Sequence, residues 1–139
     1  MSVTLAILKE PVGLTNVTAF DGTDSNQKIR RVYFQVTPSN NPANYAGAPG
    51  DTMDFTTLGD IIKTEFPPLV VIMYSAKSGG SSGYDYNYVP NAVPTLQNGT
   101  FQVLQCGGAT APMADIGAGA YPAGVLGDTV IGYADFLKL

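Results

Sequence analysis

The sequence from Pro67 to Pro90, PPLVVIMYSAKSGGSSGYDYNYVP, carries the strongest structural signal in this chain. Its first half contains an uninterrupted apolar run from Leu69 to Tyr74, rich in β-branched residues. Its second half, Gly83 to Val89, alternates tyrosine with polar residues. Both patterns predict β-strands, the first buried on both faces and the second on one. Because the glycine- and serine-rich residues 77–83 between them predict a flexible connection, we expect a β-hairpin.

The second strand of this hairpin places three tyrosines on one face: Tyr84, Tyr86 and Tyr88. A row of tyrosines can pack in a core or supply contact area to a partner, because each ring is wide and rigid and carries a polar tip. Asp85 and Asn87 occupy the opposite face of the strand, which favours the core. Both roles remain open from the sequence.

The rest of the chain shows the same β-type patterning. The clearest alternation runs from Lys28 to Thr37, with Val32, Phe34 and Val36 on one face. Further short strands are predicted at residues 3–8, 17–20, 51–57, 100–106 and 128–139, and the one helical turn at 58–66. We therefore predict an all-β fold: a β-sandwich or jelly roll of about eight short antiparallel strands with little helix, or a small barrel.

Composition limits the broad class of this protein. With 139 residues, the whole chain 1–139 is expected to form a single domain. Charged residues make up only 13% of the chain, and the formal net charge is −4 with seven Lys and Arg residues. Nucleic acid is therefore not an expected partner, because no basic stripe could neutralise phosphates. No apolar run reaches the roughly 20 residues that cross a bilayer, so no membrane association is expected.

Few residues in this chain suit catalysis or metal binding. There is no histidine, which excludes Ser–His and Cys–His nucleophiles and His-ligated zinc. The one cysteine, Cys106, follows an alternating strand and is expected to be a small buried residue, in a chain that folds in a reducing cytoplasm. The oxygen-rich residues 21–26 lack the spacing of a calcium loop and predict a turn. We therefore predict no enzyme activity, no metal and no cofactor.

Several segments resemble the small virion proteins that decorate, or cement, the capsids of tailed bacteriophages. The similarity covers roughly residues 50–139 and is one of pattern and composition. The segments that carry it are Gly50–Thr57, the apolar strand after Phe66-Pro-Pro, Tyr84–Pro90, Asn98–Val103, Ala118–Ala123, and Gly127–Val130 with the last strand. The resemblance implies a β-sandwich or jelly-roll subunit on the outside of the virion, assembled in the bacterial host cytoplasm. Its expected partners are the major capsid protein and further copies of itself, as a dimer or trimer.

Such a protein needs contact area and extended segments rather than catalytic groups. Three segments are the candidates: an N-terminal interaction arm, residues 1–11; the polar loop 38–50; and the glycine-rich segment 107–127. The interface residues predicted from them are Val3, Leu5, Ile7, Asn44, Tyr45 and Tyr121. The arm could add as a strand to a neighbour. A glycan- or receptor-binding module of a phage tail or fibre is the alternative, and it would require an exposed aromatic cluster in a loop pocket.

Overall fold

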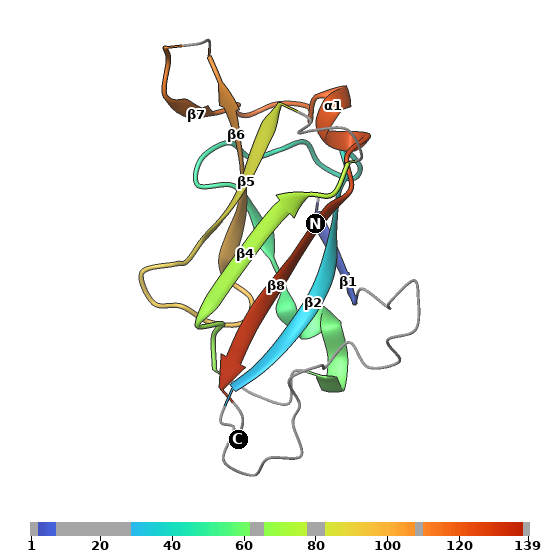
Figure 1. Cartoon of the computed structure of the whole chain (residues 1–139), viewed down its shortest axis with the longest axis vertical. Coiled ribbons are helices and arrows are strands. Elements are labelled where there is room, and N and C mark those ends of the chain that lie inside the picture. The colour runs from blue at the N-terminus through green and yellow to red at the C-terminus, as the bar shows by residue number, and fades with distance from the viewer. Residues whose placement is uncertain (1–2, 8–28, 62–65, 78–82, 108–109, 138–139) are drawn as a thin grey trace.

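The structure, a computed structural model, describes residues 3–7, 29–61, 66–77, 83–107 and 110–137. Within these residues, β-strands form two antiparallel sheets that enclose one apolar core (Figure 1). Helix is limited to two short pieces in the described ranges. The predicted all-β sandwich is therefore confirmed.

Sheet I contains the first and last strands of the chain. Its strand order is β1 (Val3–Ile7), β2 (Ile29–Pro38), β8 (Val130–Leu137) and β4 (Val70–Ser75). Figure 1 shows β4, β8 and β2 running alongside one another. The C-terminal strand is thus held between two neighbours, as its apolar sequence requires.

Sheet II is built on β6 (Gly99–Cys106), which pairs with β5 (Tyr84–Val89) along one edge. Two short strands share its other edge: β3 (Asp51–Met53) and β7 (Met113–Asp115). The remaining regular elements are a 3₁₀ helix, η1 (Phe55–Ile61), and a single helical turn, α1 (Ala123–Leu126).

The predicted hairpin is wrong, because its two strands lie in different sheets. β4 pairs with β8, whereas β5 pairs with β6. Asp128 connects the two strands instead: one of its oxygens accepts a hydrogen bond from the Ser75 hydroxyl (2.6 Å) and the other from Tyr86 (2.5 Å). The local sequence specified two strands correctly but did not specify their partners.

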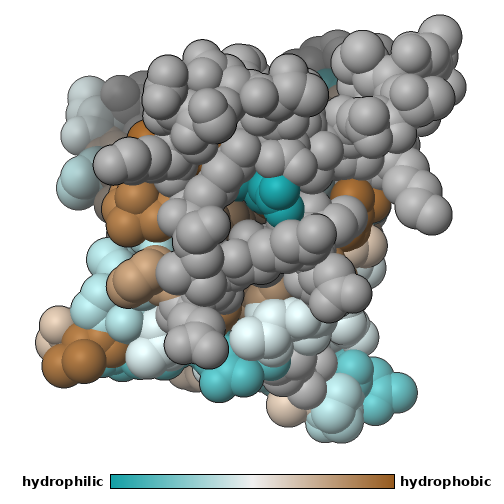
Figure 2. Space-filling view, turned by 90° about the horizontal axis from the view of Figure 1, so that it is seen from below, coloured by the Kyte–Doolittle hydropathy of each residue, from teal (hydrophilic) through white to brown (hydrophobic). Residues whose placement is uncertain are grey.

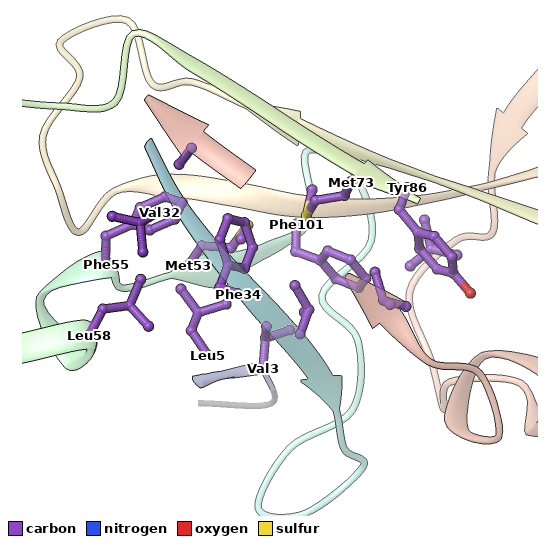
Figure 3. Close-up of a cluster of buried hydrophobic side chains, with 14 of the residues drawn as sticks. Val3, Leu5, Val32, Phe34, Met53, Phe55, Leu58, Met73, Tyr86 and Phe101 are labelled. Atoms are coloured by element: carbon purple, nitrogen blue, oxygen red, sulfur yellow. The ribbon is translucent and has the colours of Figure 1, made fainter. Parts of the chain in front are cut away.

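Aromatic side chains from both sheets fill the core (Figure 3). Phe55 is fully buried, with the rings of Phe34 and Phe136 each 5.5 Å away in edge-on contact. Tyr86 is buried and its ring stacks on Phe101 at 5.5 Å. Since Tyr84 and Tyr88 pack against the same core, the tyrosine row belongs to the interior. The core interpretation of this row is confirmed.

Two boundaries differ from the sequence prediction. The strand expected at 51–57 ends at Met53, and Phe55 begins η1, yet the Phe55 side chain remains buried. A helical turn also forms in the glycine-rich segment, where Val125 of α1 inserts into the core. Tertiary packing of an apolar side chain stabilises a turn this short more than intrinsic helix propensity does. The strand predicted at 17–20 and the turn at 21–26 lie outside the described residues.

Candidate functional site: two interaction surfaces

Two of the three predicted interaction segments meet at one end of the sandwich. The described residues of the 38–50 loop lie next to the glycine-rich segment, which contains β7 and α1 (Figure 1). Tyr45 and Gly119 form an isolated β-bridge, in which the Gly119 N–H donates to the Tyr45 carbonyl at 3.0 Å. We call this region, residues 39–50 and 110–122, the loop end.

A buried pair of tyrosines holds the loop end together. The rings of Tyr45 and Tyr121 lie 5.1 Å apart, and both side chains are buried. The Tyr45 hydroxyl donates to Asp115 at 2.7 Å and accepts from the Val103 N–H at 3.3 Å. Burial raises the pKa of Tyr45, and the hydrogen bond to the Asp115 carboxylate raises it further. Tyr45 therefore connects both loops to β6.

Tyr121, the second tyrosine of the pair, is also hydrogen-bonded to a carboxylate and to the opposite loop. The Tyr121 hydroxyl donates to the carboxylate of Asp51, which is buried and also accepts the Ala46 N–H at 2.8 Å. The Tyr121 N–H donates to the side-chain oxygen of Asn40 at 2.7 Å. These bonds satisfy buried polar groups and fix the path of two long loops.

The predicted interface residues at the loop end thus have different roles. Tyr45 and Tyr121 are brought together, but as internal supports, so their assignment to a contact surface is corrected. Asn44 is exposed next to Tyr45 and is available to a partner. Met113 of β7 is also exposed and was not predicted, because nothing in the local sequence indicates a strand at 113–115.

The described part of the N-terminal segment is a strand of its own sheet. Residues 3–7 pair with β2 in the register Val3 with Pro38 and Leu5 with Val36. Val3 and Leu5 are buried, and Ile7 packs against the core. Their apolar side chains are therefore used within this chain, which corrects the prediction that they extend from it as a free arm.

A second surface lies on the outward side of sheet I. The run predicted to be buried on both faces is buried on one: Met73 points into the core, whereas Val70, Ile72 and Tyr74 are 43%, 45% and 49% exposed. Leu69, immediately before β4, is 51% exposed. The end of the molecule seen from below, at right angles to the view of Figure 1, also exposes apolar residues among polar ones in the described part of the chain (Figure 2).

The strand register aligns these side chains with those of the neighbouring strands. Ile72 is paired with Tyr133 of β8, and Tyr133 with Tyr33 of β2. The row on one side contains Tyr74, Ile131 and Gln35. The row on the other side contains Val70, Asp135 and Arg31. We call the outward side chains of these nine positions the outer face.

The outer face contains one ion pair, in which Arg31 and Asp135 are each other's partners. Arg31 Nε and Nη2 donate to the two oxygens of Asp135 at 2.7 and 2.9 Å. The guanidinium also lies over the Tyr133 ring, 4.0 Å from its centroid. The hydrogen bonds that Arg31 donates to Asp135 raise the pKa of the guanidinium, which stays fully charged. The outer face therefore carries no net charge among its nine residues.

The outer face could have been recognised from the sequence of β8. Its residues, VIGYADFL, are apolar at nearly every position, including those that alternate with the buried Val130, Ala134 and Phe136. A two-layer sandwich has only one covered side per sheet. Apolar residues at both sets of positions therefore indicate either a third layer or an exposed apolar surface.

The described residues contain no group of three or more Cys, Asp and Glu side chains placed to hold a metal ion. Nor does any helix in these ranges have the length and apolar character needed to span a bilayer. Cys106 is exposed, contrary to the expectation of burial, because β6 continues past the edge of the core.

Comparison with known proteins adds no assignment: no family model, curated protein or solved structure matches this chain. The fold, the loop end and the outer face are thus the basis on which a function can be argued. Each surface combines exposed side chains with a rigid support, which suits a contact with another protein.

Proposed function

We propose that this chain is a structural virion protein that binds the outside of a bacteriophage capsid lattice and stabilises the shell of the major capsid protein, without catalysis. It would assemble in the bacterial host cytoplasm and remain on the capsid exterior. Three features support the proposal: the pattern resemblance over residues 50–139, the low fraction of charged residues, and the β-sandwich architecture.

The observation that carries the proposal is the construction of the loop end. Two long loops expose small and polar side chains, while buried tyrosine–carboxylate hydrogen bonds hold their backbone. A preorganised surface loses less conformational entropy on binding than a flexible one. Each contact can be weak, because a ligand that binds only the mature lattice stabilises it by mass action at many sites.

The alternative, a glycan- or receptor-binding module, has less support. It requires exposed aromatic side chains in a loop pocket. Among the described residues the exposed aromatic side chains are Phe66, which precedes β4, and Tyr74, which lies within β4. Neither lies in the loop end, where a binding pocket of this type would be expected.

Occupancy on capsids tests the proposed function. Purified protein is mixed with expanded and unexpanded capsids of the bacteriophage that encodes it, and bound protein is quantified after sedimentation. We expect saturable binding to the expanded shell and an affinity at least about tenfold lower for Met113→Glu, since a charge is introduced into an uncharged contact.

Val93→Glu provides the matched control, because Val93 is 76% exposed in the loop that joins β5 to β6, away from β7. This variant should bind as the wild type does. Wild-type protein that binds neither shell overturns the proposal. Binding to a glycan array in place of capsids would support the alternative.

A further inference from the structure

We infer that the outer face of sheet I is the contact surface between two copies of this chain, packed face to face about a two-fold axis. The inference rests on the geometry of sheet I and does not depend on the virion assignment. It commits to a dimer, one of the two oligomeric states that the resemblance implied, and it names the strands that form the contact.

The two sheets differ sharply in what their outward sides expose. On sheet II, the outward positions of β5 are Asp85 and Asn87, both exposed and polar. On sheet I, the corresponding positions of β4 are Val70, Ile72 and Tyr74, each more than two-fifths exposed. Contiguous apolar side chains on the surface of a folded domain mark a contact with another protein.

The charges on the outer face favour a second copy as the occupant. The whole chain has a formal net charge of −4, so two copies repel each other in general. The outer face is neutral, since Arg31 and Asp135 form a bidentate pair with each other. A two-fold axis brings the same surface together twice and needs a self-complementary patch. A neutral apolar surface meets that requirement without setting like charges against each other.

The composition of the outer face also suits a contact surface. Tyr33, Tyr74 and Tyr133 lie on three adjacent strands, and Arg31 lies over the Tyr133 ring at 4.0 Å. Tyrosine and arginine are enriched among the residues that carry binding energy at protein interfaces. Two sheets packed face to face, with strands roughly aligned, would interdigitate these side chains as in a sandwich core.

The size of sheet I predicts a weak dimer. The four strands of sheet I are five to ten residues long. At about 4.8 Å between strands and about 3.3 Å per residue, they cover a flat area of roughly 500 Å². Stable interfaces bury about 800 Å² per partner. We therefore expect a dissociation constant in the micromolar range, so that the dimer depends on protein concentration. Because the loop end lies at the end of the sandwich, dimerisation would leave both copies free to bind there.

Sedimentation velocity tests the inference on purified full-length protein. Between about 1 µM and about 200 µM, concentrations that bracket a micromolar dissociation constant, the wild type should shift from monomer to dimer. Ile72→Asp should weaken association at least about 100-fold, because each copy would bury an unpaired charge. Asn87→Asp adds the same charge on the outward side of sheet II and is the matched control; it should dimerise as the wild type does.

A chemical measurement locates the contact independently of the charged variant. In a Cys106→Ser background, a thiol at Ile72→Cys should react with maleimide at least about fivefold more slowly at the high concentration than at the low one, because the contact excludes the reagent and water. A thiol at Asn87→Cys should react equally at both concentrations. Circular dichroism and urea unfolding confirm that each variant is folded.

Three results would overturn the inference. The first is wild-type protein that stays monomeric, or forms a trimer, at the highest concentration. The second is an Ile72→Asp variant that dimerises as the wild type does. The third is equal maleimide reactivity at position 72 at both concentrations. A monomeric wild type whose capsid occupancy falls with Ile72→Asp would assign the outer face to the shell and also contradict the dimer.

Discussion

The loop end and the outer face differ in which side chains each region buries. At the loop end, the backbone is irregular, yet carboxylates and tyrosine hydroxyls are buried and paired, as Asp51 and Tyr121 show. On the outer face, the backbone is regular, yet apolar side chains such as Ile72 remain exposed. A buried polar group and an exposed apolar patch are the two departures from ordinary burial that most often carry information about function.

The two regions obtain a rigid backbone in different ways, and they expose different kinds of side chain to a partner. Buried hydrogen bonds hold the two loops of the loop end in place, so the exposed residues of these loops can act as a preformed surface. The outer face is already rigid because it is a sheet, and its exposed residues supply apolar area directly. The two regions can therefore be disturbed independently, which the following predictions use.

The largest effects on the free energy of unfolding are expected at glycines whose backbone packs against a neighbouring strand, one in each region. A Cβ on Gly132 of β8 would lie 2.3 Å from the Ile72 carbonyl oxygen, beneath the outer face. A Cβ on Gly50, which has φ of +118°, would lie 2.1 Å from the Phe101 carbonyl oxygen, within the loop end. We expect each change to alanine to lower the free energy of unfolding by about 3 kcal/mol or more, measured by urea denaturation.

Gly117→Ala is the control for these two variants. Gly117 also has a positive φ, +80°, but a Cβ there would meet nothing within 4 Å. Only the conformational cost remains, about 1 kcal/mol. If Gly132→Ala were as stable as Gly117→Ala, β4 would be free to move away from β8, and the outer face would not be a rigid surface.

The second prediction compares a buried carboxylate with a surface ion pair. Asp51→Ala removes the acceptor for the Tyr121 hydroxyl and the Ala46 N–H, and we expect a loss of about 2–3 kcal/mol in the free energy of unfolding. Asp135→Ala removes the partner of Arg31 on a partly exposed surface and should cost less than about 1 kcal/mol. Equal losses in chemical denaturation would show that the loop end is not held by its buried bonds.

The third prediction concerns alkaline pH. The pKa of Tyr45 is raised above its ordinary value of 10.0, mainly by burial, so the folded state holds this proton more tightly than the unfolded state does. The associated stability is complete below about pH 10 and is lost as the pH rises above it. Urea midpoints measured from about pH 8 to pH 11 should fall for the wild type and fall less steeply for Tyr45→Phe. An identical pH slope in both proteins would contradict the buried position of this hydroxyl.

The smallest effect is expected at Cys106. Because this side chain is exposed at the end of β6, Cys106→Ser should change the free energy of unfolding by less than about 0.5 kcal/mol. The thiol of the folded wild type should also react fully with a thiol-specific reagent. A thiol that reacts only after unfolding would instead support the sequence prediction that Cys106 is buried.

The sequence predicted what depends on local periodicity. The alternation in β2 gave its buried face, and the alternation in β5 gave the inward tyrosines, because successive side chains of a strand point to opposite sides. The two loops of the loop end were also found, since prolines and glycines without a period indicate irregular surface segments.

The sequence could not predict what depends on pairing across the chain. Nothing in residues 67–90 indicates that β4 pairs with β8, about 60 residues later, rather than with β5. The burial of Tyr45 and Tyr121 was likewise hidden, because an aromatic residue in an irregular loop has no pattern that distinguishes inside from outside. The outer face was missed because apolar residues on both sides of a strand were interpreted as burial on both sides.

Binding isotherms on expanded capsids test the central claim, that the loop end attaches this protein to the shell while the outer face joins two copies. We predict that Met113→Glu lowers the affinity at least about tenfold without changing self-association, since the proposed function places this charge in the contact with the shell. We predict that Ile72→Asp still fills every site on the shell, but with a lower apparent affinity, because a monomer cannot bind two sites at once. Full-affinity binding by Met113→Glu, or no binding at all by a folded Ile72→Asp variant, would contradict the account.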